Sequence, residues 1–261
     1  MIMIARPAAV AGQFYPADPA TLRKTVADLL AAAPPGTGDA KAIIAPHAGY
    51  QYSGLTAAHA YRQLESRRSR INRVVLLGPA HRVPLRGMAV PSVDAFTTPL
   101  GDVPIDKEAV EQVLELPGMQ VSDEAHAAEH SLEVHLPFLQ AVLDDFRLVP
   151  IVVGVCPATE VESVLEALWG GDETLIVVSS DLSHYHAYDD ARAIDANTTA
   201  RIEARDAAIH GEEACGAYAL NGLLLAAKAR GLKVRTLDLR NSGDTAGDKR
   251  QVVGYGAYAL A

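Results

Sequence analysis

The sequence is poor in cysteine, has no long apolar run and carries no excess of positive charge. Its 261 residues include two cysteines, Cys156 and Cys215, which form neither a CxxC pair nor a disulfide framework and are predicted to be packing residues. No stretch approaches the roughly 18 uninterrupted apolar residues of a membrane span. The first residues reach Arg6 too soon to form the apolar region of a signal peptide. These absences argue against a secreted disulfide scaffold or a membrane partner, and they predict a cytoplasmic protein.

The charge balance argues against a further class of function. Lys and Arg total 23 against 32 Asp and Glu, so the formal net charge is −9. Phosphate backbones are bound by clustered Lys and Arg, and we therefore expect no nucleic-acid partner. Apolar residues make up 49% of the chain and charged residues 21%, which is the balance of an ordinary globular protein and not of a disordered one.

Short apolar runs alternate along the chain with longer amphipathic stretches. The runs are continuous in Ile, Val and Leu, which is typical of strands covered on both faces. Because the sequence has no linker-like segment or internal repeat, we expect one α/β domain over residues 1–261 with a largely parallel central sheet. Strands are predicted over 42–45, 73–77, 148–155, 174–179, 234–239 and 252–259, and helices over 19–33, 53–64, 106–116, 131–143, 158–169, 189–209 and 216–230. Residues 86–92 are a further candidate strand, and residues 96–103 are predicted to form a loop.

Four of the predicted strands are each followed by a cluster of polar side chains. These clusters contain, in chain order, His47, His81, Asp181 with His184, and Asp244. In open α/β sheets ligands bind beyond the carboxyl ends of the strands, so the clusters converge on one crevice if the strands are parallel neighbours. Two imidazoles and a carboxylate form the facial triad that holds non-haem Fe(II), and the same donors hold Zn(II). The pattern therefore predicts a metal site.

The remaining residues of this group have candidate roles in acid–base chemistry. His184 suits proton transfer because the ordinary pKa of histidine lies near 6.5. Asp181, three residues earlier, could orient an imidazole or bind a substrate hydroxyl. The alternative for each is a hydrogen-bonded loop residue, and the alternative for Asp244 is ordinary turn chemistry.

A second cluster of histidines and glutamates lies at residues 124–135. On a helix, His126 and His130 share a face at i, i+4. The segment is not an HExxH motif, because no Glu follows the first histidine, and it is a weak candidate for metal binding by itself. We expect Glu129 and His130 to line the same pocket, whereas the alternative is a polar helix start capped by Ser131.

Six segments, in this order, make the sequence resemble a known family. The segments are RPAAVAGQFY (6–15), PHAGY (46–50), LGPAH (77–81), EHSLEVHLPF (129–138), SSDLSHY (179–185) and NSGDTAGD (241–248). Together they resemble the Memo family, whose prokaryotic members are named AmmeMemoRadiSam system protein B. The resemblance implies a fold similar to that of the class III extradiol dioxygenases, which are non-haem iron enzymes with a three-layer α/β/α core.

The resemblance also implies a set of metal ligands. Two histidines of the family's pocket correspond to His47 and His81. The third ligand varies, being a carboxylate in the dioxygenases and a cysteine in the animal Memo proteins. By its spacing that cysteine falls near Thr245, beside Asp244. Because no cysteine is present at this end of the sequence, Asp244 is inferred as the oxygen ligand, with Thr245 as the alternative.

Two functions follow from the resemblance. The first is an oxidoreductase related to the extradiol dioxygenases, with Fe(II) or, as alternatives, Cu or Zn, and with a small aromatic or catechol-like substrate. In it His184 would move protons, while Glu129, His130 and Asp181 would position groups around the substrate. The second is a non-catalytic module that binds a peptide or a protein and keeps the metal pocket. Metal-assisted hydrolysis is a third possibility, and the system name implies radical SAM proteins as partners.

Overall fold

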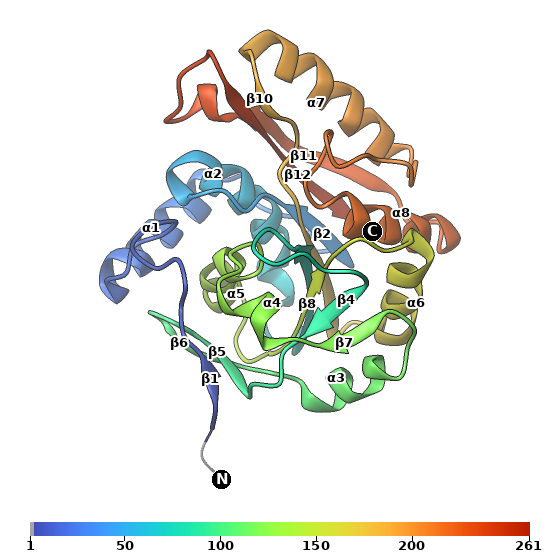
Figure 1. Ribbon diagram of the computed structural model, residues 1–261. Coiled ribbons are helices and arrows are strands. Elements are labelled where there is room, and N and C mark those ends of the chain that lie inside the picture. The colour runs from blue at the N-terminus through green and yellow to red at the C-terminus, as the bar shows by residue number, and fades with distance from the viewer. Residues whose placement is uncertain (1–2) are drawn as a thin grey trace.

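A mixed β-sheet forms the centre of the molecule. The computed structural model describes residues 3–261, so the prediction that the first six residues form no signal peptide lies partly outside the described residues (Figure 1). Four parallel strands lie in the middle of the sheet. In spatial order the strands are β10 (His184–His186), β12 (Val252–Leu260), β2 (Ala42–Ala45), β9 (Thr174–Ser179), β3 (Arg73–Pro79), β8 (Arg147–Val153), β4 (Met88–Val90) and β7 (Met119–Val121), and β11 (Val234–Asn241) also pairs with β12.

The central strands are apolar because both of their faces are covered. Every residue of β2 and β9 is buried. In the parallel register Ile43 lies opposite Val177, and Val75 lies opposite Ile176. Strand β12 runs antiparallel to β2, which makes the sheet mixed. All six predicted strands are present, and the predicted α/β class with a mostly parallel or mixed sheet is confirmed.

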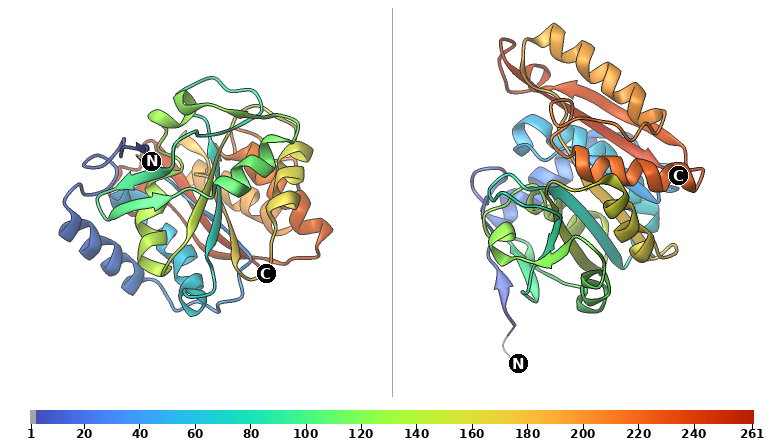
Figure 2. Two further views of the ribbon diagram at one scale, coloured as in Figure 1. Left: turned by 90° about the horizontal axis from the view of Figure 1, so that it is seen from below. Right: turned by 45° about the vertical axis from the view of Figure 1, so that its right-hand side comes forward.

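Helices cover both faces of the sheet (Figure 2). Helix α2 packs on β2, β11 and β12 with α1 and α5 behind it, while α8 packs on β3 and β9 with α6 behind it. This is the three-layer α/β/α arrangement. The Asp18 side chain accepts a hydrogen bond from the Thr21 N–H and so begins the first helix, as the Asp-Pro pair predicts. The helices are α1 (Pro19–Ala32), α2 (Tyr50–Tyr61), α3 (Lys107–Leu114), α4 (Asp123–Ala127), α5 (Leu136–Val142), α6 (Ala158–Leu168), α7 (Tyr188–Glu203) and α8 (Ala217–Ala229), with short 3₁₀ helices η1 (Arg62–Arg67), η2 (Glu133–His135) and η3 (Ser242–Asp244).

One local prediction was wrong. The predicted loop at 96–103 is a hairpin of β5 (Ala95–Thr98) and β6 (Gly101–Pro104), which pairs with β1 (Ala5–Arg6) in a small second sheet. The hairpin forms because Phe96 and Val103 bury their side chains and Gly101, at φ 123°, allows the tight turn. The sequence predicts a helix at 131–143 in which Pro137 causes a kink or begins a new turn. The structure divides this segment into η2 and α5, with Pro137 in the first turn of α5.

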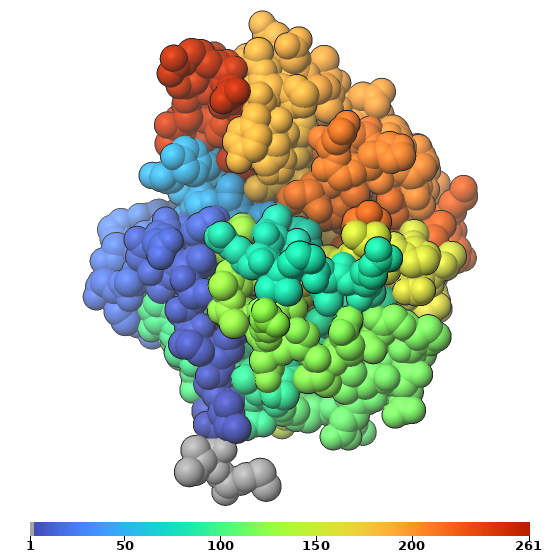
Figure 3. Space-filling view, in the orientation of Figure 1, coloured from blue at the N-terminus to red at the C-terminus, as the bar shows by residue number. Residues whose placement is uncertain are grey.

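The N-terminal segment crosses the molecule before the first helix begins. After β1 it runs alongside the residues of α4 and the loop that follows, where Figure 3 shows blue atoms against green ones. Buried apolar residues from Val10 to Leu260 form one continuous cluster. Among the described residues, no helix combines the length and the apolar character that crossing a membrane requires.

Candidate metal centre

Three neighbouring parallel strands are each followed by a side chain that can bind a metal ion or exchange a proton. His47 stands two residues beyond β2, Asp181 two residues beyond β9, and His81 two residues beyond β3. Strand β9 lies between the other two strands, so these three residues meet at one edge of the sheet. The structure therefore brings His47 and His81 together as predicted, with their ring centroids 5.1 Å apart.

A third imidazole completes the group. One nitrogen of His47, one of His81 and one of His130 all lie within 4.8 Å of one another. The ring of His130 is 4.8 Å from that of His81 and 5.5 Å from that of His47, measured between centroids. His130 comes from the loop between α4 and η2, which folds over the ends of the strands. Three converging imidazole nitrogens are a donor set that Zn, Cu, Fe and Ni accept.

Hydrogen bonds at Nδ1 set the tautomers of His47 and His81. The Ser179 hydroxyl donates to the Ser131 carbonyl at 2.6 Å, so it accepts from His47 Nδ1 at 2.7 Å. The Glu129 carboxylate lies 2.9 Å from His81 Nδ1 and accepts from it. In both rings the proton is thereby assigned to Nδ1, and the lone pair of Nε2 is left for a metal ion. Such partners at the second ring nitrogen are usual for histidines that bind metals.

Glu129 connects two of the three histidines. Its Oε2 accepts the backbone N–H of His81 at 2.6 Å, and its Oε1 lies 3.4 Å from Nδ1 of His130 and accepts the Ser131 N–H at 2.9 Å. Burial alone would raise the pKa of Glu129, but these hydrogen bonds and the adjacent His81 lower the pKa to about 2. The carboxylate is therefore ionised at neutral pH.

Two of the three histidines, His47 and His130, have lowered pKa values. Burial, reinforced by the neighbouring His81 and His130, holds the pKa of His47 well below its usual value. Burial likewise lowers the pKa of His130 to about 4, although the Glu129 charge acts in the opposite direction. Neutral imidazoles are the form that binds a metal ion, so protons compete weakly at this site.

Cys215 is a part of the site that the sequence did not reveal. Its Sγ lies 3.4 Å from Nε2 of His47 and accepts the Asp181 N–H at 3.3 Å. The prediction that it serves only for packing was incomplete, because its thiol also lines the cavity at the histidines. Burial and the nearby Asp181 raise the pKa of this thiol. Cys215 lies in the loop just before α8. The sequence around it has no pattern that predicts that this loop folds back over the end of β9.

Asp181 and His184 occupy different positions around the histidines. Asp181 is buried, its Oδ1 accepts the His47 N–H at 2.8 Å, and its Oδ2 lies 3.9 Å from Nε2 of His47. Burial raises its pKa to about 7, against the effect of the His47 N–H. His184 lines the same cavity from β10, and its Nδ1 donates to the Leu182 carbonyl at 2.8 Å. His184 does not belong to the group of three converging histidines.

Asp244 is not brought to the three histidines, contrary to the ligand assignment made from the sequence. Its Oδ2 accepts the Asn241 N–H at 3.0 Å and its Oδ1 accepts the Tyr188 hydroxyl, so the carboxylate caps η3. It follows β11, which β12 separates from β2, and two strand spacings are roughly 10 Å. Thr245, the alternative ligand, donates its hydroxyl to the Tyr52 carbonyl at 3.0 Å. His130 stands in the group in place of the expected carboxylate.

The histidines open into a cavity of about 1100 Å³. Its wall also includes Arg82, the exposed Tyr185 and Glu212. Tyr185 has a φ of 63°, a conformation that costs energy for a non-glycine residue and is concentrated at functional sites. The volume is ample for a small organic molecule beside a metal ion.

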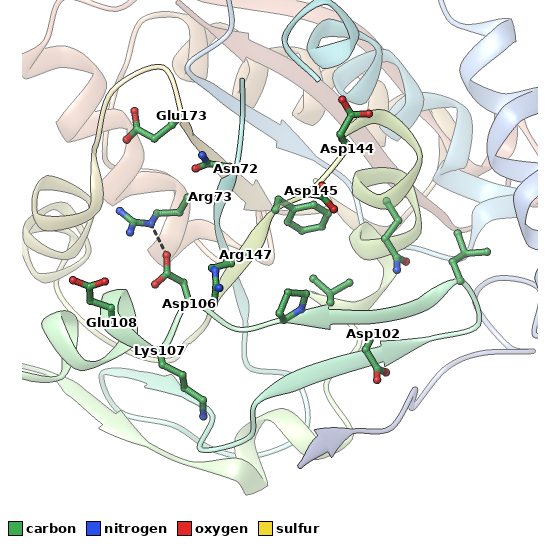
Figure 4. Close-up of a pocket in the computed structure, with 15 residues that line it drawn as sticks. Asn72, Arg73, Asp102, Asp106, Lys107, Glu108, Asp144, Asp145, Arg147 and Glu173 are labelled. Atoms are coloured by element: carbon green, nitrogen blue, oxygen red, sulfur yellow. Dashed lines mark hydrogen bonds and ion pairs between the residues drawn. The ribbon is translucent and has the colours of Figure 1, made fainter. Parts of the chain in front are cut away.

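A second large cavity, of about 1210 Å³, opens at the opposite edge of the sheet (Figure 4). Arg73, Arg147 and Glu173, at the starts of β3, β8 and β9, help to line it. Arg73 pairs with Asp106 at 2.7 Å, as the dashed line in Figure 4 marks. Among the described residues, no histidine or cysteine lines this cavity.

A buried ion pair holds the His130 loop in place. Arg6 Nη1 donates to Glu133 Oε2 at 2.7 Å, and the two side chains are 4% and 0% exposed. Glu133 also accepts the Tyr15 hydroxyl and the N–H groups of residues 9 and 10. Arg6 Nη2 donates to the Glu129 carbonyl at 2.7 Å. The N-terminal segment thus fixes the backbone from which Glu129 and His130 project.

Comparison with known proteins decides the family. A model described as "Memo-like protein" matches residues 6–259. The chain belongs to the Memo family. A MEMO1 family protein of Methanopyrus kandleri is 38% identical, with 98% of both chains covered, and one of Aquifex aeolicus is 38% identical, covering 97% of this chain and 98% of the relative. These Memo relatives align with this chain over nearly its full length.

The Memo fold also resembles a solved structure of low sequence identity. An uncharacterized protein from Escherichia coli K12 superposes with a TM-score of 0.55 at 15% identity. The match covers 84% of this chain and 99% of that one. At this identity the likeness concerns the fold alone. The resemblance to the Memo family seen in the sequence is confirmed.

Proposed function

We propose that this chain binds a redox-active divalent metal, Fe(II) in the first place, through His47, His81 and His130, and oxidises a small aromatic diol there. The observation that carries the proposal is the convergence of three imidazoles in an open cavity. Two of the rings have Nδ1 held by Ser179 or by Glu129, which leaves the lone pair of Nε2 for the metal. The Cys215 thiol lies 3.4 Å from this nitrogen of His47. These residues therefore fit a metal ion, with Cu and Zn as alternatives to Fe.

The bound metal would supply redox chemistry and a positive charge that favours the ionised form of a coordinating hydroxyl. In an extradiol cleavage both atoms of dioxygen enter the ring-opened product, so no external reductant is required. The wide cavity beside the histidines leaves room for both the diol and dioxygen. Residues of the cavity wall would then accept and donate the protons of the diol's hydroxyl groups.

Asp181 and His184 supply the proton chemistry in this proposal. Because His184 Nδ1 is occupied by the Leu182 carbonyl, its Nε2 remains to accept a proton from a substrate hydroxyl. Asp181, with a pKa raised to about 7 by burial, exchanges a proton near neutral pH. Glu129 holds His81 and His130 in position and stays ionised. The assignment of His130 as a ligand, instead of Asp244, is the change from the mechanism drawn from the sequence.

The experiment measures metal content and oxygen consumption. Wild type purified anaerobically and loaded with Fe(II) is expected to hold one ion per chain and to consume oxygen with a panel of catechols. His130→Ala is expected to lose the ion, whereas His210→Ala, which changes an exposed histidine far along the chain, keeps it. Stoichiometric, tight metal binding by His130→Ala would show that the ligand set is wrong.

A peptide-binding module is the second candidate function. Tyr185 is 70% exposed on the cavity wall, and an aromatic ring in this setting suits recognition of a peptide side chain. The test is a pull-down with proteins of the radical SAM system, which the family's name implies as partners, using metal-loaded and metal-free protein. Capture that is independent of metal, together with no oxygen uptake on any catechol, would favour this function over the first.

A further inference from the structure

The cavity of about 1100 Å³ at the three histidines is called the metal cavity below. A smaller cavity lies beside it, between the N-terminal segment, α1 and α2. It has a volume of about 600 Å³, within the range of roughly 300–1,000 Å³ that is typical of small-molecule pockets. Four aromatic rings help to line it, and no charged side chain does. The rings are those of Phe14, Tyr15, Tyr50 and Tyr52. We call it the side cavity.

The side cavity adjoins the metal cavity directly. Phe14 and Tyr52 line both cavities. They meet at Gly49, where an added Cβ would stand 3.5 Å from the Phe14 carbonyl oxygen and 3.8 Å from Cδ2 of Tyr52. The Phe14 ring also packs on the ring of His130, with centroids 4.6 Å apart. One aromatic side chain therefore separates a candidate metal ligand from the side cavity.

The chemistry of the two cavities differs. The metal cavity is lined by charged and titratable groups, among them Arg82, Asp181 and Glu212. In the side cavity the hydroxyls of Tyr15 and Tyr50 are already engaged, donating to Glu133 at 2.6 Å and to the Val134 carbonyl at 2.7 Å. These two tyrosines consequently offer the cavity ring surface and no free hydrogen-bonding group. The four rings and the lack of a charged side chain favour an uncharged, flat group, and the polar part of the lining consists of Gln13, Gln51, Thr25 and Thr245.

We propose that the side cavity binds the apolar arm of the same ligand whose chelating head binds the metal. This rests on the proposed function, because it assumes that the head is held at His47, His81 and His130. The ligand is then a two-part molecule, with a polar diol head in the metal cavity and an uncharged aromatic arm that passes Phe14 and Tyr52. A single ring on a short linker matches the volume of the side cavity.

The test compares two probes on Fe(II)-loaded protein without oxygen, so that binding is measured and no turnover occurs. The probes are catechol and 4-(3-phenylpropyl)catechol, titrated by calorimetry. We expect the arm to tighten binding by about tenfold or more, as burial of a phenyl group in a preformed apolar pocket does. Thr25→Trp, on the α1 wall of the side cavity, fills it and is expected to abolish this gain.

Two further variants serve as a control for Thr25→Trp and as its replacement. Lys24→Trp adds the same ring to an exposed neighbouring position of α1 outside the side cavity, and it is expected to retain the gain. Gln13→Trp fills the side cavity from the exposed loop and replaces Thr25→Trp if that variant fails to fold. Equal binding of both probes to wild type, or a gain that persists in the filled variants or disappears in Lys24→Trp, would overturn the inference.

Failure of the inference and failure of the proposed function give different results. Metal content and oxygen uptake with unsubstituted catechol test the proposed function by themselves. If catechol binds and is consumed while the arm adds nothing, the function stands and the side cavity has no role in the ligand. If the wild type holds no metal, the proposed function fails, and the two-part ligand fails with it.

Discussion

Glu129 accepts two hydrogen bonds from His81, one from the backbone N–H at 2.6 Å and one from Nδ1 at 2.9 Å. A single carboxylate thereby fixes both the position and the tautomer of this candidate ligand. The same Oε1 faces Nδ1 of His130 at 3.4 Å. The geometry of the candidate metal centre therefore depends on Glu129, which is not one of the three converging histidines.

Replacing that carboxylate is expected to weaken metal binding without abolishing it. In Glu129→Gln the amide nitrogen cannot accept from His81, and the negative charge beside two imidazoles is lost. We expect metal affinity to fall by about 10- to 100-fold, the usual effect of losing such a partner. Competition with a chromophoric chelator measures it. Glu124→Gln, at an exposed position on α4, is the control, and an unchanged affinity in Glu129→Gln would contradict the assigned role.

Asp244 is expected to be dispensable for metal binding. Its carboxylate caps η3 and receives the Tyr188 hydroxyl. In Asn the carbonyl oxygen can accept the Asn241 N–H, and the amide group can donate to the Tyr188 hydroxyl oxygen. Asp244→Asn should therefore bind metal within about twofold of wild type. Removal of a direct ligand in His130→Ala should cost more than the roughly 10- to 100-fold that an outer partner costs. The reverse order of effects would restore the carboxylate as the ligand.

The buried pair of Arg6 and Glu133 is expected to be essential for stability. The side chains are 4% and 0% exposed, so removing either partner leaves an uncompensated buried charge. We expect Arg6→Met to lower the free energy of unfolding by about 3–5 kcal/mol, measured by urea denaturation. Lys24→Ala, which removes one side of the exposed pair with Asp28, should cause no measurable loss.

Buried histidines are expected to make the metal-free protein sensitive to acid. His126 is 2% exposed, and burial lowers its pKa to about 4. Since its pKa is near 6.5 when unfolded, its contribution is complete above pH 6.5 and is lost as the pH falls toward 4. That loss is about 2 kcal/mol between pH 6.5 and 5.

Unfolding by urea at several pH values, with a chelator present, measures this effect. His126→Gln keeps an N–H that can donate to the Ala89 carbonyl, which His126 Nε2 approaches at 2.9 Å, but it does not titrate. Its stability should fall less steeply with acid than that of wild type. Equal slopes for the two proteins would show that His126 is not the group responsible.

The parts of the structure that could be predicted depend on local sequence. Continuous Ile, Val and Leu runs mark the buried strands, and the ends of parallel strands share one edge of a sheet, so His47 and His81 meet as expected. Likewise Asn241 and Asp244 form a reciprocal capping box, which agrees with the alternative of ordinary turn chemistry. The apolar runs and the spacing of the polar residues that follow them are enough to predict these features.

The remaining parts depend on contacts between distant segments. His130 reaches the other histidines because Arg6, from the N-terminal segment, holds the carbonyl of Glu129. Cys215 reaches His47 because its backbone N–H donates to the Asp181 carbonyl at 3.2 Å. Neither contact has a periodic or compositional signature, and so neither position follows from the sequence.

The place of β2 in the sheet has a consequence for biosynthesis. Ala42 pairs with Ile176 on one side and with Leu260 on the other. While the ribosome is still translating the first two-thirds of the message, β2, which precedes His47, has neither neighbour. Closing such long loops is slow, and the apolar strand waits exposed in the nascent chain. We therefore expect the pairing of β2 with both of its neighbours to form only after residues 252–260 have left the ribosome.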